Sequence, residues 1–137
     1  MIIDATGLIM GRIATVAAQK ALHGEQVDII NCESAVVTGN RNTLVEKFYH
    51  QRHRGGPFHG PFVPRQSHLL LKHVIKGMLP HKLTRGREAL ARIKCHIGVP
   101  KELEGKKAET IEKASSDRLQ TTKYITLKEL SFGLGAR

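Results

Sequence analysis

The first thirty residues constrain the fold most, because their apolar pattern changes period twice. Met1–Asp4 is a short apolar run typical of a strand, and Gly7 ends it. Val27–Asn31 is a second strand-like run, and Gly24 lies just before it as a helix stop. A strand–helix–strand unit with buried strands predicts a three-layer α/β domain with a mostly parallel sheet. Between the two runs, these residues recur at helical spacing: Ile9, Ile13, Val16, Ala17 and Ala21.

Further elements are predicted from turn residues and apolar spacing downstream. Residues 101–123 are polar, charge-balanced and rich in Ser and Thr, so we expect a surface excursion there. The length of 137 residues suits a single domain over residues 1–137. We expect strands over Ala35–Thr38 and Lys94–Ile97, helices over Thr43–Arg52 and Thr84–Ile93, and a terminal helix through Leu134 that opens at a capping box from Thr126.

Another helix is predicted between Ser67, which can cap its start, and Pro80, which stops it. Its inward stripe has the spacing i, i+3, i+4, i+7 and consists of Leu71, Val74, Ile75 and Met78. The neighbouring face of the same helix carries three basic side chains: His68, Lys72 and Lys76.

The excess positive charge is confined to one segment. The chain has a net charge of +10, and residues 41–96 hold twelve Lys and Arg against two acids, Glu46 and Glu88. No acid occurs from Lys47 to Arg87, and seven of the eight histidines lie within residues 41–96. A segment of one sign indicates a polyanionic partner that supplies the counter-charge. The alternative is a basic surface kept for solubility, although such surfaces normally mix both signs.

The loop Arg54–Arg65 cannot be regular, because it contains three prolines and three glycines. Its terminal arginines bracket Phe58, His59 and Phe62. Aromatic rings can stack on unpaired bases, and free backbone amides can bind phosphates, so the loop suits irregular RNA. The alternative is that the two phenylalanines fold back onto their own domain.

Lys82, Arg85 and Arg87 surround the expected helix start at Thr84. Cations at that end oppose the helix dipole, which favours anions there. Their presence is explained if a phosphate binds the helix start between them. Alternatively, the side chains point into solvent, at a cost of about tenths of a kcal/mol.

Features that would indicate catalysis are weak. Residues 7–11 lie where a dinucleotide fingerprint would stand, but their glycine spacing is wrong, and nothing matches a P-loop. Asp4 and Asp28 lie at strand ends, where such acids more often hold a loop or cap a helix than act as an acid–base pair. We expect no catalytic residue and no cofactor.

Features that would indicate a metal or a membrane are also weak. The motif His50-x-x-His53 and the pair Cys95-His96 lack a second half at zinc-site spacing. Cys32 and Cys95 are interpreted as reduced, buried small hydrophobes, which fits a cytoplasmic protein. No apolar run approaches the ~18 residues of a membrane span, and no signal segment is expected.

Four short motifs occur in the same order as in the L-thirteen family of large-subunit ribosomal proteins, which this chain resembles over residues 2–98. Tyr124–Gly135 is similar to the family tail of the archaeal branch. The loop from Arg54 to His59 differs from the Tyr-Pro-Gly-Gly loop of bacterial members, and the long basic extension of eukaryotic members is absent, so the resemblance is to an archaeal-type protein. The motifs are Asp4-Ala5 with Gly11-Arg12-x-Ala14, Asn31-x-Glu33, Thr38-Gly39-Asn40, and Gly77-Met78-Leu79-Pro80-His81-Lys82 followed by Arg85-Gly86-Arg87.

The resemblance implies an α/β/α fold around a four-stranded parallel sheet, no enzymatic activity, and a structural role on large-subunit ribosomal RNA beside neighbouring ribosomal proteins. Two alternatives stay open: a small nucleotide-dependent or RNA-modifying enzyme on the same kind of sheet, and a free-standing RNA-binding regulator. We expect RNA contacts from Arg12, Arg41, Lys47, Arg52, His53, Arg54, Phe58, His59, Arg65, His68, Lys72, Lys76, His81, Lys82, Arg85 and Arg87.

Overall fold

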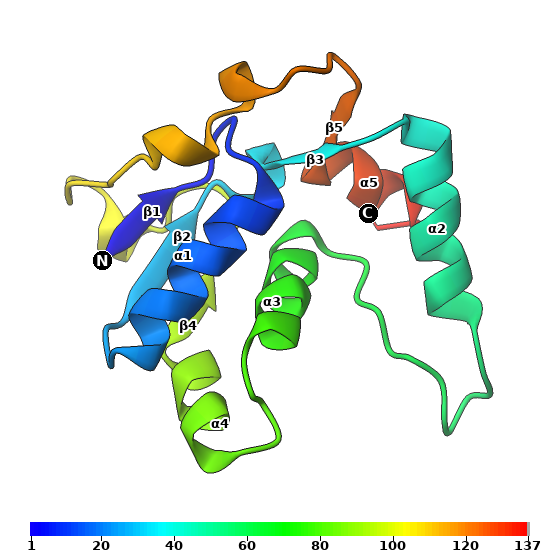
Figure 1. Cartoon of the computed structure of the whole chain (residues 1–137), viewed down its shortest axis with the longest axis horizontal. Coiled ribbons are helices and arrows are strands. Elements are labelled where there is room, and N and C mark those ends of the chain that lie inside the picture. Colours follow the sequence, from blue (N-terminus) through cyan, green and yellow to red (C-terminus); the bar gives the residue numbers. More distant parts are fainter. Residues whose placement is uncertain (137) are drawn as a thin grey trace.

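The expected strand–helix–strand unit forms the N-terminal part of the computed structural model, which describes residues 1–136 (Figure 1). Strands β1 (Ile2–Asp4) and β2 (Val27–Ile30) pair in parallel. Strand β4 (Ile93–Cys95) pairs in parallel with the other edge of β2, so the strand order is β1-β2-β4. Helix α1 (Met10–Leu22) connects β1 to β2. The structure therefore confirms a mixed α/β domain built on a parallel sheet.

Three helices gather on one face of this sheet. Helix α1 contacts both α3 (Ser67–Met78) and α4 (Thr84–Ala91), and α3 and α4 contact β4. On that face the sheet presents apolar side chains, while the other face carries Asp28 and the exposed Lys94. Because α1, α3 and α4 share the apolar face, the expected arrangement with helices on both faces is not confirmed. The fully buried residues of this core include Ile3, Ile13, Val27, Ile29, Leu71 and Ile93.

The parallel sheet has three strands among residues 1–136, and not the expected four. The candidate fourth strand, β3 (Val36–Thr38), pairs antiparallel with β5 (Tyr124–Thr126) in a separate two-stranded sheet. The chain turns away from the first sheet at Asn31, whose φ of 53° lies in the left-handed region, and then forms a 3-10 turn at Cys32–Ser34. This turn prevents β3 from continuing beside β2.

Helix α2 (Arg41–His53) lies apart from the parallel sheet and rests on α5 (Leu127–Gly133) (Figure 1). The Asn40 side chain caps its start by accepting a hydrogen bond from the Asn42 N–H. The helices predicted over Thr43–Arg52 and from Thr126 are both confirmed, as α2 and α5. The predicted cap of α5 is confirmed as well, because Thr126 Oγ1 accepts a hydrogen bond from the Glu129 N–H at 3.2 Å. The residues of α2 that pack toward the core are Leu44, Val45 and Phe48.

The predicted register of α3 is partly wrong. Gln66 is the N-cap, so Ser67 is the first helical residue and its side chain is buried. Leu70 is buried together with Leu71 and Ile75, whereas Met78 is 44 % exposed. Leu79, just past the helix end, is buried in the core, where Met78 was expected to pack.

The boundary after α4 also differs from the prediction. Helix α4 ends at Ala91, and Ile93 is the first residue of β4 and not the last inward residue of the helix. The strand accordingly covers Ile93–Cys95 and not Lys94–Ile97. Ile93 pairs with Val27, so pairing with β2 decides the start of this strand.

Residues 101–123 run past the edge of β1. Three 3-10 turns occur there: Lys101–Leu103, Glu112–Ala114 and Ser116–Arg118. Glu109 forms a parallel bridge with Ile3, and the Ala114 oxygen accepts from the Ile9 N–H at 2.8 Å. Ala114 is fully buried, so this stretch contributes one side chain to the core. None of the helices formed by residues 1–136 has the length and apolar character needed to cross a bilayer.

Candidate nucleic-acid interface

The basic segment 41–96 comprises α2, the loop after it, α3, α4 and β4. In Figure 1, α2 lies at the right of the molecule, α3 in the middle and α4 at the bottom. Among residues 1–136, Arg92 is the only Lys or Arg of this segment with a carboxylate within ion-pair distance, Glu88 at 3.7 Å. The other cations therefore lack an acidic neighbour in the described chain. The exposed ones are Arg41, Lys47, Arg54, Arg65, Lys76, Lys82, Arg85, Arg87 and Lys94. Such an arrangement of like charges favours a polyanionic partner.

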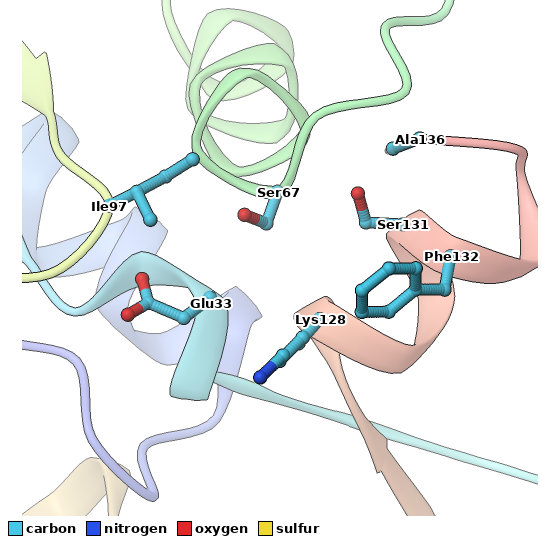
Figure 2. Close-up of a pocket in the computed structure, with 7 residues that line it drawn as sticks. All are labelled: Glu33, Ser67, Ile97, Lys128, Ser131, Phe132 and Ala136. Atoms are coloured by element: carbon cyan, nitrogen blue, oxygen red, sulfur yellow. The ribbon is translucent and has the colours of Figure 1, made fainter.

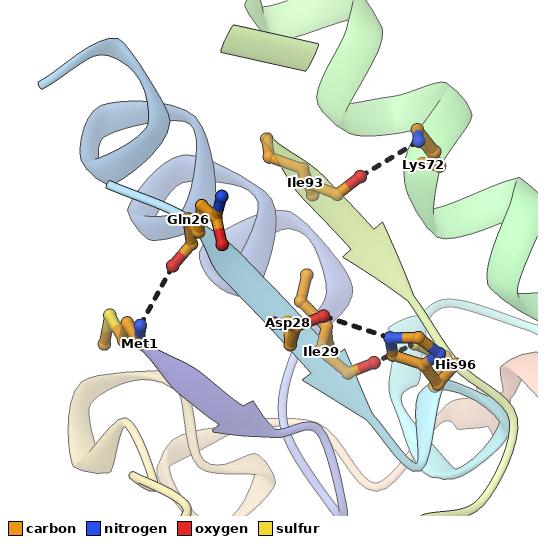
Figure 3. A network of polar contacts seen from close by, with 8 residues as sticks. Met1, Gln26, Asp28, Ile29, Lys72, Ile93 and His96 are labelled. Carbon is orange, nitrogen blue, oxygen red and sulfur yellow. Dashed lines mark hydrogen bonds and ion pairs between the residues drawn. The ribbon is translucent and has the colours of Figure 1, made fainter. Parts of the chain in front are cut away.

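Two of the predicted contact residues brace the protein itself. The Arg52 guanidinium donates to the Val63 oxygen, and Lys72 Nζ donates to the Ile93 oxygen at 2.9 Å (Figure 3). Both side chains are half-buried. A lysine ammonium has three donors and an arginine guanidinium has five, so each retains donors for a ligand. Their first role is to fix the loop to α2 and α3 to β4.

The loop Arg54–Arg65 presents its aromatic rings to solvent. Phe58 is 87 % exposed and Phe62 is 75 % exposed, so neither ring packs into the domain core. The loop is anchored instead by Val63, which is 6 % exposed. Gly55 has a φ of +84°, and a Cβ there would lie 2.9 Å from the Gly60 Cα, so the loop closes tightly on itself. Exposed rings beside Arg54 and Arg65 have the composition of a base-stacking surface.

The turn from Pro80 into α4 places three exposed cations at a helix start. The N-cap residue of α4, Leu83, supplies no side-chain acceptor, so the first backbone N–H groups of the helix lack a side-chain cap. Gly86 lies against the turn, since a Cβ there would stand 2.1 Å from the Pro80 oxygen. The Arg87 guanidinium donates to the Lys82 oxygen at 3.3 Å. The motif Arg85-Gly86-Arg87 therefore combines two exposed cations with the one residue small enough for this contact.

The predicted histidines lie in different environments. His53 stacks on the Tyr49 ring at a centroid distance of 4.0 Å, and His59 is exposed. His81 is half-buried, with Nδ1 3.4 Å from the Leu79 oxygen. Burial lowers the pKa of His68 below its ordinary value of 6.5, and the nearby His96 lowers it further. The buried Nδ1 of His68 has no hydrogen-bond partner among the described residues, so this ring contributes mainly packing.

Arg12 lies outside the basic segment and lines a groove of about 450 Å³. Its guanidinium donates to the Lys113 oxygen at 2.6 Å. The side chains of Lys113 and Arg118 line the same groove, with Val16 and Ile111 as apolar walls. The sequence had not indicated Lys113 or Arg118, because both belong to a charge-balanced stretch. Only the docking of residues 101–123 beside α1 brings them to Arg12.

An enzyme on this fold would need a cleft with titratable groups directed at a substrate. One cleft has a volume of about 240 Å³, and its polar lining residues are Glu33, Ser67, Lys128 and Ser131 (Figure 2). Both Glu33 carboxylate oxygens accept from the Gly98 N–H at 3.1 Å, and Ser131 Oγ donates to the Arg65 oxygen at 2.7 Å. Two of the polar groups in this cleft therefore hold neighbouring loops in place.

Asp4 and Asp28 also make contacts of a structural kind. Burial alone would raise the pKa of Asp4, but hydrogen bonds from Thr6 and Asn31 outweigh it, so its pKa is lowered. Asp28 Oδ1 lies 3.1 Å from His96 Nε2, and this contact joins β2 to the residue after β4 (Figure 3). Within residues 1–136, no three His, Cys, Asp or Glu side chains gather as a metal site would require.

A basic α/β protein whose exposed cations lie on an irregular loop and at a helix start has the features of an RNA-binding protein. The family model described as Ribosomal protein L13 matches residues 1–102. The chain belongs to the ribosomal protein L13 family, as its motifs indicated.

Curated relatives match over nearly the whole chain. The large ribosomal subunit protein uL13 of Methanosarcina barkeri is 42 % identical over 137 residues, which cover 99 % of this chain and 98 % of the relative. The protein of the same name from Haloarcula marismortui is 43 % identical over 136 residues, covering 99 % and 91 %. That from Methanocaldococcus jannaschii is 40 % identical over 140 residues, covering 99 % and 98 %.

Proposed function

We propose that this chain is a non-catalytic, structural constituent of the large ribosomal subunit, where it binds and organises large-subunit ribosomal RNA. Its relatives carry the name of a large-subunit protein. The observation that carries the RNA-binding part is the basic segment 41–96, in which Arg92 is the only Lys or Arg with an acidic partner among residues 1–136. Phosphates would supply the missing counter-charge and allow RNA helices to pack together.

The proposed contact residues divide by their environment. Exposed cations at the turn before α4, along α2 and at both ends of the loop neutralise phosphates, and Phe58 stacks on a base. Arg52 and Lys72 contribute charge from half-buried positions, while His53, His59, His68 and His81 hydrogen-bond or pack at the margin. The phosphate contacts are Arg12, Arg41, Lys47, Arg54, Arg65, Lys76, Lys82, Arg85 and Arg87.

The remaining expectations belong to the same proposal. Residues 1–137 act as one folded unit, with residues 101–123 as a surface excursion. The protein works in the cytoplasm, contacts neighbouring ribosomal proteins, and uses no cofactor or small-molecule substrate.

The enzyme alternative loses support from both the family and the cleft. The curated relatives are named for a ribosomal subunit, and Glu33, the acid that lines the cleft, accepts from the Gly98 N–H. A free-standing regulator would differ from a ribosomal constituent only in where the protein is found.

Sedimentation tests the proposal directly. An epitope-tagged chain expressed in its host should migrate with large subunits in a sucrose gradient. A variant with Arg85→Glu and Arg87→Glu should stay at the top of the gradient, while the matched control Lys106→Glu with Lys107→Glu should migrate like the wild type. Migration of the wild type as a free protein would contradict a ribosomal role and favour the regulator.

Salt dependence tests the interface separately. With about 6–10 phosphate contacts, affinity for a ribosomal RNA fragment should fall roughly 10³- to 10⁵-fold between about 50 and 200 mM salt. An affinity that hardly changes with salt would exclude the basic segment as the main contact surface.

A further inference from the structure

The two cysteines, far apart in the sequence, meet at the carboxyl end of the parallel sheet. Cys95 is the last residue of β4 and pairs with Ile29 of β2. Cys32 begins the 3-10 turn after β2, and its N–H donates to the His96 oxygen at 3.1 Å. Its Sγ donates to the Ile29 oxygen at 3.4 Å, and the same oxygen accepts from the His96 N–H at 2.8 Å. Cys32 therefore lies against the residue that follows Cys95, and the two thiols influence each other's pKa.

The two thiols differ in their exposure to solvent and in the direction of their pKa shifts. Cys32 is fully buried, whereas Cys95 is partly exposed. The interaction with Cys95, followed by burial, raises the pKa of the Cys32 thiol far above its ordinary value. The interaction with Cys32 lowers the pKa of the Cys95 thiol, burial opposes this, and the ammonium of Lys72 lowers it further.

Lys72 is held in place for this role. Its Nζ donates to the Ile93 oxygen at 2.9 Å, two residues before Cys95 on the same strand (Figure 3). The carboxylate of Asp28 raises the pKa of the Cys95 thiol. The same carboxylate lies 3.1 Å from His96 Nε2. A fixed cation beside a partly exposed thiol is an environment in which the reactive thiolate forms more readily.

We propose that Cys95 and Cys32 form a redox-active pair, in which Cys95 is the attacking thiol and Cys32 the resolving thiol, and which a peroxide converts to an intramolecular disulfide. The Cys95 thiolate attacks one peroxide oxygen: an S–O bond forms, the O–O bond breaks, and hydroxide leaves, so that Cys95 becomes a sulfenic acid. The Cys32 sulfur then attacks the Cys95 sulfur, its thiol proton goes to the departing hydroxyl, and water leaves. The peroxide is reduced to two waters, and the two thiols are oxidised to one disulfide.

Such a bond would enclose every Lys and Arg of the basic segment. Every residue from Arg41 to Lys94 lies in the chain between Cys32 and Cys95. A disulfide that closes a long loop restricts the unfolded chain and so raises the midpoint of thermal unfolding. The oxidised protein would therefore hold α2, α3 and α4 in a covalently closed loop.

The experiment uses the purified full chain under native conditions with hydrogen peroxide as the oxidant. Three proteins are compared: the wild type, Cys32→Ala and Cys95→Ala. Free thiols are counted with a colorimetric thiol reagent after the peroxide is removed and the chain is denatured. Peptide mapping then looks for a Cys32–Cys95 linkage, and dimedone, which reacts with sulfenic acids, marks any Cys95 intermediate.

The expected result is the loss of both thiols in the wild type, a linked peptide that a reductant separates, and a higher unfolding midpoint for the oxidised chain. Cys32→Ala should accumulate dimedone-labelled Cys95 without a linked peptide, because the resolving thiol is missing. Cys95→Ala should retain its Cys32 thiol under the same treatment, because that sulfur is buried.

Three outcomes would overturn the proposal: two free thiols in the treated wild type, a linkage only between two chains, or dimedone labelling of Cys32 in place of Cys95. The wild-type measurements decide the proposal even if either alanine variant does not fold. None of the measurements involves RNA or ribosomes, so they stand independently of the proposed function.

Discussion

Replacing Gly86 with alanine tests whether α4 and the turn before it are as tightly joined as the structure indicates. A Cβ at this position would lie 2.1 Å from the Pro80 oxygen and 2.3 Å from its carbonyl carbon, whereas ordinary contacts begin at 3.4 Å. The helix and the turn would therefore have to separate by more than an ångström. That movement disturbs the hydrogen bond from the Leu83 N–H to the Pro80 oxygen, which measures 2.9 Å.

The magnitude follows from two opposing effects. Overpacking that shifts backbone costs about 1–3 kcal/mol, and the upper part of that range applies because both partners are backbone. Alanine regains about 1 kcal/mol through its better helix propensity. We therefore expect Gly86→Ala to lower the free energy of unfolding by about 1–2 kcal/mol. Because the turn carries Lys82 and the start of α4 carries Arg85, RNA affinity should fall as well.

Urea unfolding followed by circular dichroism measures the effect, and the chain contains a matched control. Gly77 lies in α3, and a Cβ there would meet nothing within 4 Å. Gly77→Ala should raise the free energy of unfolding by up to about 1 kcal/mol, since it restricts only the unfolded chain. If Gly86→Ala is as stable as Gly77→Ala, the close approach of Gly86 to Pro80 does not exist in solution, and our explanation of this motif is wrong.

Three further predictions concern surface side chains. Phe58→Ala should leave the free energy of unfolding within about 0.5 kcal/mol, because the ring is 87 % exposed, and should weaken RNA binding by about 1–3 kcal/mol through lost stacking. Arg85→Gln with Arg87→Gln should reduce the salt slope of RNA binding by roughly 0.7–0.9 per lost phosphate contact while the chain stays folded. The lowered pKa of His68 means that its neutral form stabilises the fold above about pH 6.5, and that this contribution is lost as the pH falls below that value. His68→Gln should therefore lose less stability on acidification than the wild type, whereas the exposed His73→Gln should behave like the wild type.

Each of these predictions has a result that contradicts it. A sharp loss of stability in Phe58→Ala would place the ring in the core, and thermal unfolding measures this. An unchanged salt slope, determined by filter binding over a salt series, would remove Arg85 and Arg87 from the interface. Circular dichroism measures the stability of the His68 variant and of the wild type as the pH is lowered. If both lose the same stability, the His68 ring has no role in the pH response.

Local patterns account for most of what could be predicted about the secondary structure. Helix α1 follows from its apolar spacing and Gly24, and α5 follows from the capping residues beginning at Thr126. Both signals lie within a few residues of the element they specify, because capping and helical burial are local. The prediction for α3 was wrong at Met78, because the residue that fills the core there is Leu79, outside the helix.

The interface was predictable in its charge but not in the geometry of its side chains. Exposure of Phe58 and of the cations around α4 agrees with the sequence interpretation. The carbonyl groups that accept from Arg52 and Lys72 lie at Val63 and Ile93, which no local pattern connects to them. Lys72 therefore has a bracing role that its helical face alone would not suggest.

The amino-acid sequence by itself determined the strand–helix–strand beginning, the confinement of the excess positive charge to residues 41–96, and the family, because each is a property of residue order. Only the tertiary structure decided that β3 pairs with β5 near the other end of the chain, and that Cys32 lies against the end of the strand that carries Cys95. Such pairings depend on which distant segments are brought together when the core forms. The loss of chain entropy on closing a loop depends only weakly on the length of the loop, so separation along the sequence hardly favours one partner over another. Local spacing therefore cannot choose between partners, and the packing of the whole domain does.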